Sequence, residues 1–371
     1  MAVLPDDPVW QGGAICRDNK HSMRQYESDQ LTGSRRYGAG YNGRQGGDIL
    51  IKQVRVDLPG RAGDPDFHLN TYQGGEGPAV VFCHGFPDLA LGWHRQLEVV
   101  AAAGFRVIAP DMRGYGSSSC PQAVEAYRLD DLTGDVVALL DALGLEQAIM
   151  VGHDWGGFIT WATAVLHPDR VRGVAAGCTP YMPFPDVATH LAVVEGDVER
   201  QYVAWFQQEG VAEAYMDAHV SDIVAKIMRT APPLEELIEA VVVEGKINMN
   251  PFREVHNVPE LGDPLLSDAH FAAYVDAYTR TGFRGGINWY RNIDYNKQAW
   301  PEVGVQPLHV PCLMLTADRD PALRPEMAAD MDQRCGQLEM HNIDKAGHWV
   351  QQEQPEVFNQ HLLGWLNKHF Q

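Results

Sequence analysis

The sequence has no apolar run long enough to cross a membrane, and it has few positive charges for its length. A membrane-spanning helix needs roughly 18 consecutive apolar residues, so we expect no transmembrane segment. The 371 residues carry 29 lysines and arginines against 49 aspartates and glutamates, a formal net charge of −20. This charge repels phosphate at long range, which argues against a nucleic-acid partner or binding to an anionic membrane.

Cysteine pairs and metal-ligand spacings are also missing. The six cysteines include no C-x-x-C pair. Cys83, Cys178 and Cys312 fall in or beside apolar strand-like runs, where a free cysteine behaves as a small buried hydrophobe. The 15 histidines show no H-E-x-x-H or similar spacing, and the first residues do not read as a secretory signal peptide. We therefore expect a reduced, cytoplasmic protein that needs no metal.

The hydrophobic pattern divides the chain into three regions. Residues 1–48 are polar and glycine-rich, and we interpret them as an N-terminal arm that wraps the surface or is partly disordered. Residues 49–180 and 308–371 alternate short apolar runs with longer helical stretches. This alternation predicts an α/β class with a mostly parallel central sheet and helices on both faces. Residues 181–307 are mainly helical in pattern and too long for a loop, which predicts an inserted helical cap.

Apolar runs and their periodicity also predict the individual elements. We expect strands at 49–58, 67–73, 79–83, 106–109, 148–151, 173–177, 312–316 and 338–343, of which the first two alternate like an antiparallel pair. We expect core helices at 93–103, 132–143, 158–166, 326–333 and 355–368. Within the cap we expect helices at 199–209, 220–228, 233–243 and 269–279.

The most informative short segment is Gly152-His153-Asp154-Trp155-Gly156. An apolar run precedes it and a helix-compatible stretch follows, which predicts a strand, a sharp turn and a helix with Asp154 at the tip of the turn. Many hydrolases place a serine nucleophile there, and that serine attacks acyl carbon. A carboxylate can instead displace a leaving group at saturated carbon and form an ester with it. Asp154 is therefore the expected nucleophile.

Two further residues are expected to complete a triad with Asp154. Asp320 follows the apolar run 312–316, and His348 follows the last expected strand. Nucleophile, acid and histidine stand in the chain order of the α/β-hydrolase triad, and such folds place their sites at strand ends. Asp318 lies in the same loop as Asp320, and either could accept the imidazole N–H.

The turn His84-Gly85-Phe86-Pro87 follows the strand at 79–83. In this fold that turn supplies one backbone N–H to an oxyanion hole, and the residue after the nucleophile supplies another. We assign these two donors to the backbone amides of Phe86 and Trp155. The segment 111–116, after the next strand, is expected to be a structural turn.

Together these motifs resemble an epoxide hydrolase of the α/β-hydrolase fold. The resemblance lies in HGFP, DMRGYG, GHDWGG, the loop acid and GHW, and it runs from about Ile51 to the end of the sequence. It is closest to the catalytic domain of soluble epoxide hydrolases, without the phosphatase-like domain of the mammalian enzyme. Two cap segments resemble those that carry the family's acid tyrosines, which implies Tyr202 and Tyr290 in that role. The resemblance also favours Asp320 over Asp318 as the acid.

The resemblance implies that an apolar epoxide is opened to a vicinal diol, a detoxification reaction that needs no cofactor. Asp154 would form a hydroxyalkyl ester, and water activated by His348 would hydrolyse it. A phenol is protonated at neutral pH and can donate to the epoxide oxygen. A monomer or a homodimer is expected. The side chains expected to contact the substrate are Trp155, Phe158, Trp289 and Trp349.

Two other functions stay open at this point. A haloalkane dehalogenase also uses an aspartate on the elbow, but it must stabilise a halide. Trp155 stands where such enzymes have a halide-binding tryptophan, but Phe86 stands where they often have an asparagine donor. A pair of acid tyrosines is also unexplained by dehalogenation. A non-catalytic ligand-binding protein of the same fold could retain the triad residues.

Overall fold

The computed structural model describes residues 50–371, so the arm predicted at 1–48 lies outside the described part. An eight-stranded sheet of order β1-β2-β4-β3-β5-β6-β9-β10 forms its centre. The sheet comprises β1 (Lys52–Asp57), β2 (His68–Gly74), β3 (Ala79–Cys83), β4 (Arg106–Pro110), β5 (Ala148–His153), β6 (Val171–Gly177), β9 (Leu308–Ala317) and β10 (Cys335–Ile343). Only the pairings of β2 with β1 and β4 are antiparallel. The predicted α/β class and mostly parallel sheet are confirmed.

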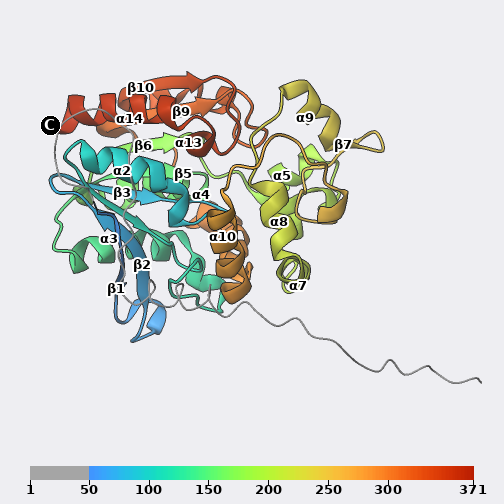
Figure 1. Cartoon of the computed structure of the whole chain (residues 1–371), viewed down its shortest axis with the longest axis horizontal. Coiled ribbons are helices and arrows are strands. Elements are labelled where there is room, and N and C mark those ends of the chain that lie inside the picture. The colour runs from blue at the N-terminus through green and yellow to red at the C-terminus, as the bar shows by residue number, and fades with distance from the viewer. Residues whose placement is uncertain (1–49) are drawn as a thin grey trace, which may run out of the picture.

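Helices cover both faces of this sheet (Figure 1). They are α2 (His94–Ala102), α3 (Leu129–Ala142), α4 (Trp155–Leu166), α13 (Val350–Glu353) and α14 (Pro355–Phe370). Successive side chains of a strand point to opposite faces, and in β3 Val81 packs with α3 and α4 while Val80 and Phe82 pack with α2 and α14. The near-continuous apolar runs of the central strands follow from this burial on two sides.

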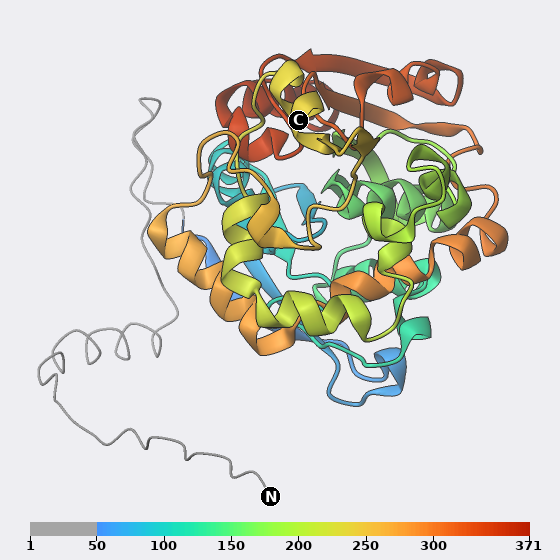
Figure 2. The same cartoon turned by 90° about the vertical axis from the view of Figure 1, so that its right-hand side faces the viewer.

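Between β6 and β9 the chain leaves the sheet and forms mainly helices, which gather at one end of it (Figures 1 and 2). We call residues 181–307 the cap, and its status as a separate domain stays a prediction. The cap contains α5 (Val187–Val193), α6 (Tyr202–Trp205), α7 (Val211–Ala218), α8 (Val220–Ile227), α9 (Leu234–Val241), α10 (Asp268–Thr281), α11 (Arg284–Arg291) and α12 (Ile293–Ala299). A two-residue hairpin, β7 (Val242–Val243) and β8 (Lys246–Ile247), follows α9.

Three helix predictions were wrong in extent. Two short 3-10 turns, Pro325–Ala328 and Met331–Gln333, replace the helix expected at 326–333, because Asp330 adopts φ −109° and ψ 12° between them. The helix expected at 199–209 is only α6, and Gly210 follows that stretch with φ +79°. The helix expected at 233–243 ends at Val241, where the chain enters β7.

The helices α5, α7, α11 and α12 were not predicted from the sequence. Each has only seven or eight residues, which is about two turns and too few for a 3.6-residue period to stand out. In α11 the pattern is further obscured by Gly285 and Gly286, two residues of low helix propensity.

Candidate active site

The turn between β5 and α4 holds Asp154 in an unusual backbone conformation. Its φ is +53° and its ψ is −126°, a strained region for a residue with a side chain. Two glycines permit the turn: a Cβ on Gly152 would lie 2.3 Å from the Gly156 carbonyl oxygen, and one on Gly156 would lie 2.0 Å from that of Cys83. Thr179 donates its hydroxyl to the Asp154 carbonyl at 2.8 Å. The strand–turn–helix arrangement therefore sets the carboxylate at the carboxyl end of β5.

The two oxygens of the Asp154 carboxylate have different partners. Oδ1 accepts the Phe86 N–H at 2.7 Å, and the Trp155 N–H also donates to the carboxylate. Oδ2 lies 3.7 Å from Nε2 of His348. Burial raises the pKa of Asp154, while the charge of His348 and the two backbone donors act in the opposite direction. The Phe86 amide, one of the two assigned to the oxyanion hole, thus holds Oδ1, whereas Oδ2 faces the histidine.

Asp320, rather than Asp318, contacts the imidazole of His348. Oδ2 of Asp320 lies 2.9 Å from Nδ1 of the ring, and its Oδ1 accepts the N–H groups of Ala322 and Leu323 at 2.8 and 3.0 Å. Burial acts to raise the pKa of Asp320, but the charge and hydrogen bond of His348 and these two donors outweigh it and hold the pKa at about 2. Asp318 instead accepts the Ala346 N–H at 3.2 Å.

The imidazole of His348 lies between two carboxylates. Burial acts to lower its pKa, but the charge and hydrogen bond of Asp320 and the charge of Asp154 outweigh burial and raise the pKa to about 9. His348 is therefore protonated at neutral pH while Asp154 carries its charge. Removal of the charge on Asp154 lowers the pKa of His348, so that more of the imidazole is neutral and free to accept a proton at neutral pH.

The cap places Tyr202, from α6, and Tyr290, from α11, beside the turn that carries Asp154. Their ring centroids lie 5.5 Å apart, and the Tyr290 ring lies 5.5 Å from that of Phe86 and 5.2 Å from that of Trp155. Burial raises the pKa of both phenols well above the usual range, and the charge of Asp154 adds to the effect. Both hydroxyls stay protonated at neutral pH and are available as donors.

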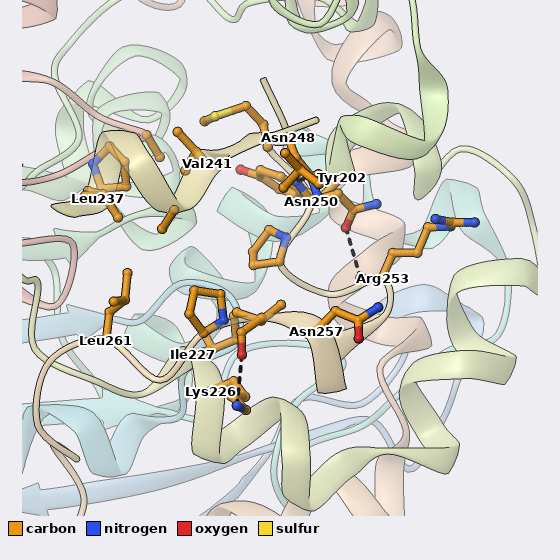
Figure 3. Close-up of a pocket in the computed structure, with 18 of the residues that line it drawn as sticks. Tyr202, Lys226, Ile227, Leu237, Val241, Asn248, Asn250, Arg253, Asn257 and Leu261 are labelled. Atoms are coloured by element: carbon orange, nitrogen blue, oxygen red, sulfur yellow. Dashed lines mark hydrogen bonds between the residues drawn. The ribbon is translucent and has the colours of Figure 1, made fainter. Parts of the chain in front are cut away.

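A cavity of about 690 Å³ extends from Tyr202, His348 and Trp349 into the cap. Figure 3 shows its cap lining, which includes apolar side chains such as Ile227, Leu237, Val241 and Leu261 together with three asparagines, Asn248, Asn250 and Asn257. The charged residues of the lining are Asp197, Glu199, Arg200, Lys226, Arg229, Glu244, Arg253 and Glu254. Most of this lining comes from segments with no hydrophobic period, which is why the sequence did not indicate it.

Of the four side chains expected to contact substrate, Trp349 lines this cavity, and the other three are not among its lining residues. Trp289 is fully buried and its Nε1 donates to the Arg113 carbonyl at 3.3 Å. Trp155 is 3% exposed and packs against Tyr290. Phe158 stacks on Phe184. Substrate contact for Trp155, Phe158 and Trp289 stays a prediction.

Within residues 50–371, no helix is both long and apolar enough to cross a membrane. In the same part of the chain, no group of three or more histidine, cysteine, aspartate or glutamate side chains is placed to hold a metal ion.

A family model described as alpha/beta hydrolase fold matches residues 78–355. The chain is 37% identical over 321 residues to bifunctional epoxide hydrolase 2 of Mus musculus, covering 83% of this chain but 55% of the mouse protein. It thus spans about half the length of that relative. It is 37% identical over 306 residues to epoxide hydrolase A of Mycobacterium tuberculosis, covering 80% of this chain and 94% of that protein. A crystal structure of epoxide hydrolase A from Mycobacterium thermoresistibile superposes with a TM-score of 0.75 at 34% identity, covering 85% of this chain and 98% of that one.

Proposed function

Because this chain belongs to the α/β-hydrolase fold family and, within it, to the epoxide hydrolases, we propose that it opens an epoxide to a vicinal diol through an ester on Asp154. The observation that carries the proposal is the environment of that carboxylate. Two backbone N–H groups hold it, His348 faces Oδ2, and two protonated tyrosines from the cap lie beside the turn.

In the first half-reaction, Oδ2 of Asp154 attacks an epoxide carbon and the bond between that carbon and the epoxide oxygen breaks. The oxygen would become an alkoxide, which is a poor leaving group unless an acid donates to it. Tyr202 and Tyr290 hydrogen-bond this oxygen, and one of them supplies the proton. The product is a hydroxyalkyl ester whose carbonyl oxygen, Oδ1, keeps its hydrogen bond from the Phe86 amide.

Ester formation prepares the second half-reaction by removing the negative charge of Asp154. The pKa of His348 then falls, because one of the charges that raised it is gone, and its proton returns to the tyrosine that protonated the epoxide oxygen. The neutral imidazole, oriented by Asp320, accepts a proton from water as the water attacks the ester carbonyl. The oxyanion develops on Oδ1, where the two amides stabilise it. Cleavage of the acyl C–O bond then releases the diol, whose new hydroxyl takes the second proton of the water, and leaves Asp154 as a carboxylate beside a protonated His348.

The contacts favour an epoxide over an alkyl halide as substrate. A departing halide needs N–H donors, yet Phe86 has no polar side-chain atom. The indole N–H of Trp289 already donates to Arg113, and the side chain of Trp155 is hydrogen-bonded to Tyr290. Tyr202 and Tyr290, whose pKa values are raised, can donate hydrogen bonds and a proton to an alkoxide oxygen. A cytoplasmic location, a role in detoxification and the oligomeric state stay predictions from the sequence.

One experiment separates these activities. The protein is incubated with styrene oxide and, separately, with 1-chlorobutane, and diol and chloride are measured. We expect diol from styrene oxide and no chloride, and no diol from Asp154→Ala. Intact mass spectrometry of His348→Gln with styrene oxide should show an added mass equal to that of the epoxide. Chloride release without diol would instead indicate a dehalogenase, and neither product would favour a binding protein.

A further inference from the structure

The backbone of the turn that carries His348 donates hydrogen bonds to a carboxylate outside the triad. Glu353, in α13, accepts the Gly347 N–H at 2.9 Å with Oε2 and the Trp349 N–H at 3.0 Å with Oε1. These amides flank His348 on both sides. Oε2 also accepts the N–H of Ala231 at 2.9 Å. Ala231 belongs to the cap and lines the cavity, so one carboxylate joins the histidine turn to the cap wall.

Further contacts connect the same cap segment to residues beside the triad. The indole N–H of Trp349 donates to the Ile227 carbonyl at 2.8 Å. The Arg319 guanidinium, next to Asp320, contacts the Ala231 carbonyl at 3.4 Å. A Cβ on Gly347 would lie 2.2 Å from Cβ of Ala231, so the cap segment and the histidine turn meet in direct contact.

Glu353 also contributes charge at this place. Burial raises its pKa, which the three backbone donors and the charge of His348 oppose. Its negative charge is in turn one of the influences that raise the pKa of His348. No lysine or arginine within residues 50–371 forms an ion pair with it. The three amides and the imidazole are therefore its partners.

We propose that Glu353 is a positioning residue. It holds the backbone on both sides of His348 next to the cap segment at Ala231 and so supports hydrolysis of the ester. The inference rests on the proposed function and extends it to a residue outside the triad. In glutamine one of the two oxygens becomes an NH₂ group, which would face a backbone N–H. At least one of the three amides then loses its acceptor, and the turn that carries His348 loosens.

The two half-reactions should respond differently to this change. Ester formation uses Asp154 and the cap tyrosines, whereas ester hydrolysis uses His348. We expect Glu353→Gln to slow ester hydrolysis about tenfold, the size of effect expected from one lost buried hydrogen bond, and to change ester formation by less than about twofold. Because a negative charge near His348 is lost, the acidic limb of the pH profile for hydrolysis should move to lower pH.

The test is a single-turnover measurement with styrene oxide, quenched at intervals and analysed by intact mass from about pH 5 to 9. Glu356→Gln is the matched control, since Glu356 is exposed on the first turn of α14, three residues further on. It should behave as wild type in both steps. Glu353→Asp keeps the charge but has a side chain one carbon shorter. We therefore expect slower ester hydrolysis, with the acidic limb of its pH profile at the wild-type position.

Each outcome bears on the inference. Slower ester decay and a shifted limb in Glu353→Gln support it. Unchanged decay in that variant would overturn it, and so would a parallel fall in both steps, which indicates general loosening. If Glu353→Gln does not fold, Glu353→Asp carries the test, and decay at the wild-type rate would count against the inference. A wild-type protein that forms no ester and no diol would refute the proposed function and this inference with it.

Discussion

Replacing Asp154 with asparagine tests how the charge of Asp154 controls the pKa of His348, the histidine beside it. Nε2 of His348 lies 3.7 Å from Oδ2 of Asp154. At this distance two unit charges attract by about 4 kcal/mol at an effective dielectric constant near 20, or roughly 3 pKa units. Because 19% of the His348 side chain is exposed, water screens part of this attraction. We expect the pKa of His348 to fall from about 9 by about 1 to 3 units.

The assay is an NMR titration of the imidazole C–H resonances. His348 can be identified among the 15 histidines by its missing signal in His348→Gln. Asparagine keeps the size of aspartate, and its amide oxygen can still accept the Phe86 N–H, so the change reports mainly on charge. A His348 pKa that stays near 9 in Asp154→Asn would refute the claim that ester formation turns this histidine into a base.

The interaction between His348 and Asp154 also makes the free energy of unfolding depend on pH. A histidine whose pKa is raised on folding contributes stability that is complete below its unfolded pKa, near 6.5, and that is lost as the pH rises through its folded pKa. For His348 that folded value is about 9. The difference in Tm between wild type and Asp154→Asn should therefore shrink as the pH is raised from about 7 to 10.

Four further substitutions have expected results that can be measured. Asp320→Asn should slow ester hydrolysis by about 10³-fold, because the imidazole loses the acceptor that sets its tautomer and charge, and quenched-flow mass spectrometry should show the ester accumulating. Tyr202→Phe and Tyr290→Phe should each slow ester formation by about 10²-fold with ester decay unchanged, whereas equal slowing of both steps would indicate a packing role. Gly156→Ala should lower stability by about 3 kcal/mol or more, since its Cβ would lie 2.0 Å from the Cys83 carbonyl oxygen; an unchanged Tm would contradict the close approach.

Local signals account for what could be predicted from the sequence. The central strands β3, β4, β5 and β6 are apolar runs of strand length bounded by turns, and the Asp154 turn has glycines where the backbone needs them. The helix expected at 326–333 was wrong because apolar spacing alone cannot distinguish one helix from two tight turns that bury Ala328 and Met331. Burial and packing decide between them.

Contacts between distant segments account for what could not be predicted. Glu353 binds two amides of its own turn and one amide from a cap residue 122 positions earlier, and no periodicity indicates such a contact. The cavity wall near Asn248 and Leu261 likewise comes from irregular segments of the cap. The choice of Asp320 over Asp318 needed the resemblance, because both lie in one loop and only the folded chain brings one to the imidazole.

In the proposed mechanism, the oxygen that is added to the epoxide carbon comes from the carboxylate of Asp154 and not directly from water. This claim is tested most directly by a single turnover of styrene oxide with excess protein in H₂¹⁸O. We expect an unlabelled diol and ¹⁸O in the Asp154 carboxylate, since water attacks the ester carbonyl and Oδ2 leaves with the product. A diol carrying ¹⁸O, with an unlabelled Asp154 peptide, would contradict it.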